Sequence, residues 1–301
     1  MAATQTPDGD RVLKRDLETG IRADFTGKKR ETYGDFLQLK TLLSLQQTIM
    51  DPPQRDEMLF IIIHQVSELW LKLMLFELTQ IRDNLALDRL GIALKGTGRV
   101  KAIQEQLISA WKTLLTMTPA DYLQFRDALG NSSGFQSWGY RQVEYIMGNK
   151  DASYIRVHKH DPEIVALLET ALAQPSIYDE VIRLLARQDF AVPAELIERD
   201  FREPYAGDGR IVAIWEQIFR DTERYWDLYD LAEKLMDMET LFQRWRFDHV
   251  SAVERVIGMR PGTGGSSGVA FLKKALDLKF FHDLYDVRNV LVHDTRPGAT
   301  L

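Results

Sequence analysis

The stretch MLFIIIHQVSELWLKLMLFEL, residues 58–78, decides how the chain is expected to fold. Fifteen of its 21 residues are apolar, which predicts a long helix buried in protein. The length also suits a membrane span, but Gln65, Glu68 and Lys72 lie in the middle, where polar and charged groups are costly in lipid. His64 follows six consecutive apolar residues. A buried imidazole needs a bonding partner, which is either more core or a ligand.

Helical periodicity extends over most of the remaining chain. Further segments that carry it are TYGDFLQLKTLLSLQQ (32–47), VKAIQEQLISAWKTLLTM (100–117), ADYLQFRDAL (120–129), DPEIVALLETALA (161–173), SIYDEVIRLLARQ (176–188), GRIVAIWEQIFRDTERYWDLYDLAEKLMDMETLFQRW (209–245) and VAFLKKALD (269–277). Thr118 and Pro119 have the form of a helix N-cap followed by proline at the first helical position. Strand-like alternation is scarce. We therefore predict an all-α fold, with a polar, flexible N-terminal tail over residues 1–25 and one helical domain over residues 26–301.

Composition excludes several classes of protein. The net charge of −6 argues against a nucleic-acid-binding protein, which needs a basic face to neutralise phosphates. The absence of cysteine excludes disulfides, thiolate nucleophiles and thiolate-held metal clusters, and it fits a reducing compartment. The first 20 residues contain no apolar core of the kind that a signal peptide needs. We expect a cytoplasmic protein that does not enter a membrane.

Two of the six histidines are candidates for chemistry. His158 and His160 lie in the charged connector RVHKHDPE and are expected to be exposed. His282 and His293 flank the final helix, where each could serve as a surface or capping group. His249, by contrast, occupies an apolar helical stripe, as His64 does. That stripe consists of Met238, Leu241, Phe242, Trp245, Val253 and Val256.

The residues alone leave the ligand of these histidines open. A di-iron bundle needs Glu-x-x-His, and no histidine here has a glutamate three residues before it. Zinc normally takes three or four protein ligands, and no cysteine is present. A haem needs one proximal imidazole and a large apolar pocket, so it is the most economical choice. Both histidines could also be ordinary core residues in a cofactor-free helical scaffold.

Two polar features accompany the histidines. GMRPGTGGSSG, residues 258–268, lacks the lysine of a phosphate-binding loop and the spacing of a dinucleotide fingerprint. It is either a flexible linker or a loop whose backbone and Thr263 hydroxyl wrap a ligand. Tyr122 and Arg126 are four residues apart and share a helical face. In isolation, Arg126 is expected to form a salt bridge with an acidic side chain.

Taken together, several segments resemble the tryptophan 2,3-dioxygenase family of haem enzymes. The resemblance rests on TYGDFLQL, DEMLFIIIHQVSELWLKLMLFEL, FRDALGNSSGFQS, RFDHV and GTGGSSG, which occur in the family's order and cover about residues 30 to 300. It implies a haem-dependent reaction in which both atoms of O₂ are added across the indole C2–C3 bond of L-tryptophan. The product is N-formyl-L-kynurenine, at the first step of tryptophan degradation by the kynurenine pathway.

The resemblance also implies roles for single residues. His249 matches the axial ligand of the haem iron, and His64 matches the distal histidine that hydrogen-bonds the indole N–H. Phe60 matches the aromatic packing against the indole, Arg126 the carboxylate contact and Thr263 the ammonium contact. The other residues that the resemblance places in the pocket are Tyr122, Leu129 and Ser133.

The family further implies a homotetramer whose N-terminal segment reaches a neighbour's pocket. In this chain that segment contributes Tyr33, Phe36 and Leu37, with Phe36 standing where a tyrosine is often found. A haem protein that binds indoles without oxygenating them would need the same pocket residues, so it remains a second reading.

Overall fold

The computed structural model describes residues 15–16, 20–21, 32–265 and 267–291. Contacts divide the chain into two units, Met1–Gln47 and Thr48–Leu301, each compact by itself. The sequence-based boundary between residues 25 and 26 stays a prediction. Most of the expected flexible tail, and His293 at the other end, lie outside the described residues.

In its described residues, the N-terminal unit contains only short elements. Strands β1 (Arg15–Asp16) and β2 (Gly20–Ile21) pair antiparallel, and helices α1 (Tyr33–Phe36) and α2 (Leu39–Leu42) follow. The sequence predicts a longer helix here, and that prediction is wrong. Gln38 between the two helices has a φ of +52°, and neither helix contains a buried residue. Because a helix draws most of its stability from packing one face, this segment has little to hold a longer one.

In the part that the structure describes, the regular elements of the larger unit are all helices, as predicted. Its α-helices are α3 (Arg55–Ala86), α4 (Leu90–Leu114), α5 (Pro119–Phe125), α6 (Trp138–Met147), α7 (Pro162–Ala173), α8 (Ile177–Arg187), α9 (Ala194–Ile197), α10 (Gly209–Arg220), α11 (Trp226–Val256), α12 (Val269–Lys274) and α13 (His282–Val290). Its 3₁₀ helices are η1 (Arg126–Leu129), η2 (Gly134–Gln136), η3 (Ala152–His158) and η4 (Ala275–Asp277). The run 209–245, expected to be helical throughout, is interrupted at residues 221–225 between α10 and α11.

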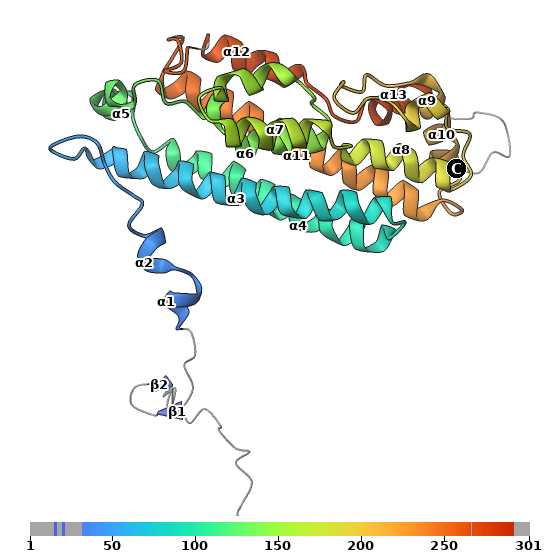
Figure 1. Ribbon diagram of the computed structural model, residues 1–301, viewed down its shortest axis with the longest axis horizontal. Helices are drawn as coiled ribbons and strands as arrows, with labels where there is room; N and C mark the ends of the chain where they lie inside the picture. Colours follow the sequence, from blue (N-terminus) through green and yellow to red (C-terminus); the bar gives the residue numbers. More distant parts are fainter. Residues whose placement is uncertain (1–14, 17–19, 22–31, 266, 292–301) are drawn as a thin grey trace, which may run out of the picture. The chain divides into compact units, whose positions relative to one another are not determined.

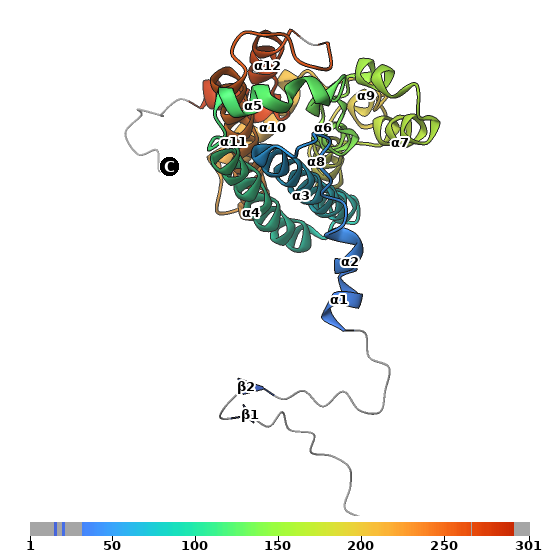
Figure 2. The same ribbon diagram turned by 90° about the vertical axis from the view of Figure 1, so that its left-hand side faces the viewer.

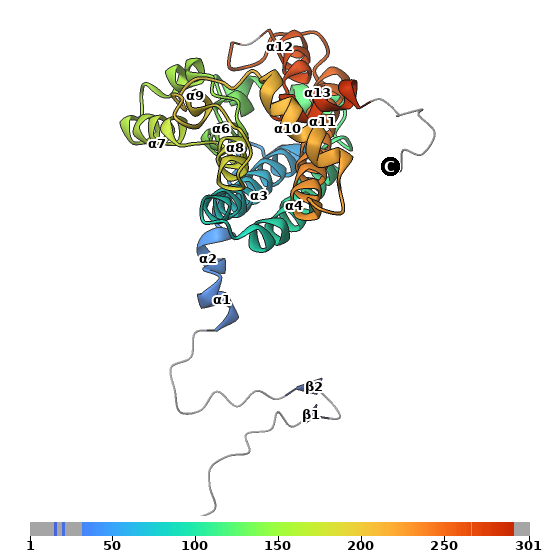
Figure 3. The same cartoon turned by 90° about the vertical axis from the view of Figure 1, so that its right-hand side faces the viewer.

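Three long helices form the framework of the larger unit. α4 packs against both α3 and α11, and α3 also packs against α6 and α8 (Figure 1). Viewed from one end, α5 lies across the tips of α3, α4 and α11, close to α12 (Figure 2). At the opposite end, α10 and α13 pack together beside α11 (Figure 3). The start of α3, the end of α4, α5 and the end of α11 therefore meet at one end of the bundle.

Helix α3 is buried on one side only, so the expectation that this helix is enclosed in protein is wrong for the single chain. Leu71, Met74 and Leu78 are buried against the bundle. The opposite side exposes apolar residues, namely Ile62, Val66, Leu69, Leu73 and Phe76. By length and composition, α3 could cross a membrane, although it packs along the bundle through α4, α6 and α8. The exposed side is therefore a surface that needs an explanation.

The start of α5 confirms the predicted cap. The Thr118 hydroxyl accepts a hydrogen bond from the Asp121 backbone N–H, and the Asp121 carboxylate accepts one from the Thr118 backbone N–H. Pro119 occupies the first turn, where its missing N–H costs nothing. This capping box fixes where α5 begins, and so where Tyr122 and Phe125 enter the core.

Candidate functional site

A small aromatic cluster joins α3, α4, α5 and the end of α11 at the end of the bundle where α5 lies. Its buried members are Leu114, Met117, Tyr122, Phe125 and Val256, and the partly buried residues packed on them include Phe60, Trp111 and Leu129. Phe60 lies with its ring centroid 6.2 Å from that of Tyr122 and 5.5 Å from that of Phe125. Phe60, Tyr122 and Leu129, three of the residues expected in a pocket, are thus members of one cluster.

His64 adjoins this cluster through Phe60, one turn before it on α3. The two ring centroids are 4.1 Å apart, and Nδ1 of His64 lies 2.7 Å from the carbonyl oxygen of Phe60. Burial lowers the pKa of His64, and the bond to the Phe60 carbonyl opposes that shift only in part. His64 is therefore a neutral imidazole at pH 7, held by its own helix.

His249 on α11 contacts two indole rings. The ring of Trp111 stacks on it nearly parallel, with centroids 4.6 Å apart and an interplanar angle of 11°. Trp245 approaches at 5.5 Å with a tilt of 43°. Burial, with a smaller contribution from the charge of His64, lowers the pKa of His249 to about 4. Both predicted histidines are therefore neutral at pH 7.

The donor set at His249 fits a haem better than a metal held by side chains alone. Within the described part of the chain, no group of three or more His, Cys, Asp or Glu side chains could hold a metal ion. His249 is neutral and makes no hydrogen bond to a described residue, so a ring nitrogen is available as an iron ligand. The rings that contact it, Trp111 and Trp245, are aromatic, and Trp111 packs on an apolar cluster, which suits a porphyrin.

Arg126 forms no salt bridge with any described residue, contrary to the expectation for this residue taken in isolation. Its Nη2 donates to the carbonyl of Pro261 at 3.0 Å, and its Nε is buried without a partner. The guanidinium also lies against Tyr122. Burial raises the pKa of the Tyr122 hydroxyl, and the charge of Arg126 partly offsets this. A guanidinium with an unpartnered Nε–H can donate a hydrogen bond to a carboxylate.

The glycine loop packs onto the segment that follows Arg126. The Thr263 hydroxyl donates to the carbonyl of Ser132. A Cβ at Gly264 would lie 2.6 Å from Cβ of Ser133, so only glycine permits this close approach. The structure therefore brings Thr263, Ser133 and Arg126 to one place, although they come from two distant parts of the sequence.

The remaining predicted residues are placed differently. Tyr33, Phe36 and Leu37 belong to the N-terminal unit, where Tyr33 and Phe36 are 75% and 73% exposed. Their expected role in a neighbour's pocket stays a prediction. His158, expected to be exposed, is buried, and its Nε2 has no described partner. The connector that holds it forms the 3₁₀ helix η3, which packs on α7.

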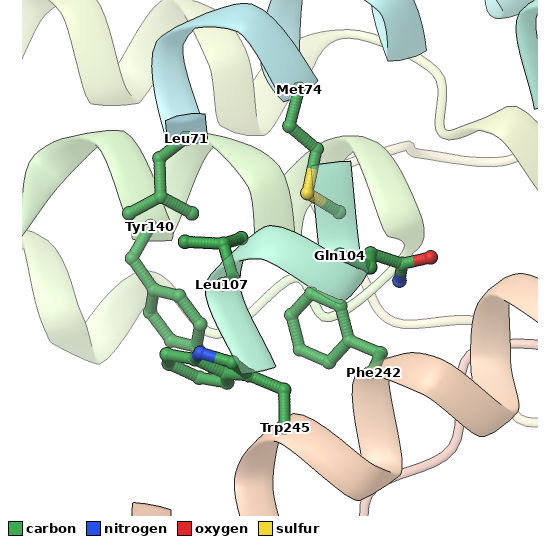
Figure 4. A pocket seen from close by; sticks show the side chains of 7 residues that line it. All are labelled: Leu71, Met74, Gln104, Leu107, Tyr140, Phe242 and Trp245. Atoms are coloured by element: carbon green, nitrogen blue, oxygen red, sulfur yellow. The ribbon is translucent and has the colours of Figure 1, made fainter. Parts of the chain in front are cut away.

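Sequence reasoning missed Trp111 and Phe125 as parts of the site. Trp111 was recognisable only as one apolar position of α4, and nothing in its neighbourhood pointed to a histidine far along the chain. Trp245, recognised as part of the apolar stripe, also lines a small cavity together with Leu107, Tyr140 and Phe242 (Figure 4). That cavity measures about 10 Å³, room for one water, and is too small for a cofactor.

Buried charges support α11 next to the site. Arg246 pairs with Glu144 of α6 at 3.2 Å and donates to the carbonyl of Leu278 at 2.9 Å. Arg141 pairs with the second oxygen of Glu144. Glu239, two turns before Arg246, accepts hydrogen bonds from two backbone N–H groups at residues 280 and 281. These bonds anchor α11 to α6 and to the segment before α13.

Comparison with known proteins identifies the family. The family model described as tryptophan 2,3-dioxygenase matches residues 18–217 and 206–291. A tryptophan 2,3-dioxygenase of Myxococcus xanthus is 50% identical over 278 residues, 92% of this chain and 95% of that protein. Proteins of the same name from Bacillus thuringiensis and Serratia proteamaculans are 47% and 48% identical over 275 residues, which is 91% of this chain and 97% and 98% of theirs. The chain therefore belongs to the tryptophan 2,3-dioxygenase family.

Proposed function

We propose that this chain catalyses the haem-dependent addition of both atoms of O₂ across the indole C2–C3 bond of L-tryptophan. The C2–C3 bond breaks, each carbon becomes a carbonyl, and the product is N-formyl-L-kynurenine, the first intermediate of the kynurenine pathway. Family membership supports the reaction, since the relatives carry the name of this enzyme.

The hydrogen bond at His64 is the observation that carries the proposal furthest. A carbonyl oxygen only accepts hydrogen bonds, so the proton of the neutral ring must be on Nδ1, facing Phe60. Nε2 is then left as an acceptor. The indole N–H of tryptophan is a donor only and would match it. Phe60 and Tyr122 provide apolar surface on which an indole ring can pack. His64 would thus orient the substrate rather than remove its proton.

The polar end of the substrate would be held by Arg126 and Thr263. The unpartnered Nε of Arg126 can donate to the carboxylate of an amino acid, and a guanidinium suits a carboxylate geometrically. Because the Thr263 hydroxyl donates its proton to Ser132, its oxygen lone pairs remain free to accept from an ammonium group. Leu129 and Ser133 would complete this wall, since Leu129 belongs to the aromatic cluster and Ser133 lies against Gly264.

Haem b would be held by His249 as axial ligand, one per subunit, and in the ferrous form it would supply the activation of O₂. The residues around His249 would exclude water through their aromatic side chains. The chain's own contribution to catalysis is therefore to hold the cofactor on α11, orient the indole from α3, and fix the amino-acid end from η1 and the glycine loop.

An absorption experiment separates this proposal from an indole-binding haem protein. Haem-supplied protein is reduced without air, L-tryptophan is added, and air is then admitted. We expect a Soret band that responds to tryptophan, followed by the absorbance of N-formylkynurenine. A Soret response without product would favour the binding protein. Absence of a haem band would mean that both histidines are ordinary core residues.

An Arg126→Ala variant in the same assay tests the carboxylate contact. Losing a charge-assisted hydrogen bond should raise the KM for tryptophan by roughly 10- to 100-fold, with a smaller change in kcat. The matched control is Arg255→Ala, on an exposed arginine of α11. An unchanged KM in Arg126→Ala would assign the carboxylate contact to another residue.

We also propose that the apolar side of α3 is covered by another copy of this chain in a homotetramer. Ile62, Val66, Leu69, Leu73 and Phe76 are spaced alternately by four and three residues, the spacing with which one helix packs along a second. Charged residues on the opposite, buried side favour protein over lipid, since Glu77 there is paired with Arg99. A cytoplasmic location accords with this assignment.

The oligomeric state of a Leu73→Lys variant tests this surface. Light scattering should give a tetramer for the wild type and smaller species for Leu73→Lys, whereas Lys72→Glu, at the neighbouring exposed position, should remain tetrameric. A tetramer for Leu73→Lys would place the interface elsewhere. Binding of the wild type to lipid vesicles would instead indicate a membrane surface.

The N-terminal segment is proposed to act on a neighbouring subunit. Mixing two variant chains tests this. One variant carries Tyr33→Ala and Phe36→Ala with its histidines intact, and the other carries His249→Ala with its N-terminal segment intact. Each chain alone should have little activity. Mixed oligomers should recover activity if Tyr33 and Phe36 act on a neighbour, because the intact segment then reaches an intact site. If the segment serves its own chain, the mixture stays as inactive as its parts.

A further inference from the structure

The orientation of His249 has an unusual source. Histidines that bind metals are normally oriented by a hydrogen bond from the second ring nitrogen to a carboxylate or carbonyl. Among the residues that the structure describes, His249 has no such partner. Two indole rings contact it instead, one from its own helix and one from α4.

The two indoles are not equivalent. Trp245 precedes His249 by one turn of α11, so it moves with that helix and meets the imidazole at a tilt of 43°. Trp111 comes from the last turn of α4 and lies nearly flat on the imidazole, at 11° and 4.6 Å. A flat contact blocks rotation of the imidazole about its Cβ–Cγ bond, because turning the ring would drive its edge into the indole face.

Packing alone holds Trp111 in this position. Its Nε1–H is buried without a hydrogen-bond partner among the described residues, so no polar contact fixes the ring. Its aromatic neighbours do so: Trp245 lies 5.7 Å away, and the cluster with Tyr122 and Phe125 packs around it. A phenyl ring at this position could therefore replace much of what the indole does, whereas an aliphatic side chain could not.

We propose that Trp111 is a positioning residue that fixes the plane of the His249 imidazole by stacking, in place of a hydrogen bond. This inference rests on the proposed function, in which His249 holds the haem iron. The orientation of the axial ligand then depends on how α4 packs against α11. The contact between these two helices thereby acquires a role in cofactor binding besides its role in the core.

The stack itself can be tested without haem. In full-length protein with labelled histidine, the imidazole protons of His249 should be shifted upfield by the indole face. We expect Trp111→Leu to remove most of that shift and Trp111→Phe to keep a substantial part. The control is Trp226→Leu, at a tryptophan that is 60% exposed, and it should leave the His249 signals in place. Unchanged His249 signals in Trp111→Leu would overturn the stack.

The consequence for the cofactor is tested in haem-loaded, ferrous protein. Trp111→Leu should shift or broaden the iron–histidine stretching band in resonance Raman spectra. It should also speed the transfer of haem to apomyoglobin by roughly 2- to 10-fold, the range expected for one aromatic stack. Trp111→Phe should restore both readouts towards the wild type. A Trp111→Leu variant with the wild-type band and transfer rate would refute the positioning role. A wild type without any haem would refute the proposed function while leaving the proton shifts as a separate result.

Discussion

Helices α3 and α11 are nearly equal in length, with 32 and 31 residues, but they use their surfaces in opposite ways. α11 buries 11 of its residues and α3 buries seven. The outward positions of α11 are mostly polar, among them Asp237, Thr240, Arg244, Ser251 and Glu254. The outward positions of α3 are a line of large apolar side chains.

The difference shows which helix has its apolar residues covered within one chain. α11 places its apolar residues inside and even buries charges, because Glu144 of α6 pairs with Arg246. Only the inner side of α3 is covered by other parts of the chain, and exposed apolar stripes of this size mark a surface for a partner. Each helix also carries one of the two histidines, so the site joins an internal helix to a helix at the edge.

The largest effect should come from removing the two histidines separately. His249→Ala should lose or badly loosen haem, because the imidazole supplies the axial bond. His64→Ala should keep the haem and show weaker turnover, because His64 only orients the substrate. Haem content measured from the Soret band, beside a folding check by circular dichroism, distinguishes the two. Equal haem loss in both variants would contradict the distinction in which α11 holds the cofactor and α3 orients the substrate.

The next effect should come from the buried charge on α11. Arg246→Ala would leave Glu144 buried with only Arg141 as partner and remove the bond to the Leu278 carbonyl. We expect a loss of about 3–5 kcal/mol in the free energy of unfolding, as for other broken buried pairs. Lys101→Ala is the control, because it breaks the exposed pair between Lys101 of α4 and Asp237 of α11. It should lower the free energy of unfolding by only about 0–1 kcal/mol.

Denaturant unfolding of both variants gives the comparison. Similar small losses would mean that α11 does not depend on its buried charges. In that case its interior position would rest on apolar packing alone, as the inner side of α3 does.

Much of this fold could be predicted from periodicity, and the exceptions have physical reasons. The apolar spacing of residues 58–78 and the Thr118–Pro119 cap predicted α3 and α5, because both signals are local. Residues 32–47 show the same leucine spacing but form only two four-residue helices, because none of the residues in those helices is buried in this chain. Which side of α3 would be buried also depends on neighbours that periodicity does not reveal.

The candidate site was less predictable than the fold. His64 and His249 stood out because each interrupts an apolar stripe, but their roles came from the family resemblance. The guanidinium of Arg126 is bonded to the carbonyl of Pro261, and the ring of His249 stacks on Trp111. Both contacts join parts of the chain that are distant in sequence. His158 lay among charged residues and was expected outside, yet it is buried.

The smallest predicted effect tests how tightly the inner side of α3 packs on α4. Gly98 on α4 has open space around it, so Gly98→Ala should raise the free energy of unfolding by about 0.5–1 kcal/mol through helix propensity. At Gly96, an added Cβ would lie 2.8 Å from Cγ1 of Ile81, a buried residue of α3. Moving Ile81 should cost about 1–3 kcal/mol, enough to cancel or exceed the same gain. Thermal unfolding of the two variants measures the difference. If both are equally stabilised, α3 can move away from α4 at little cost, and its inner side would be no more firmly packed than its exposed one.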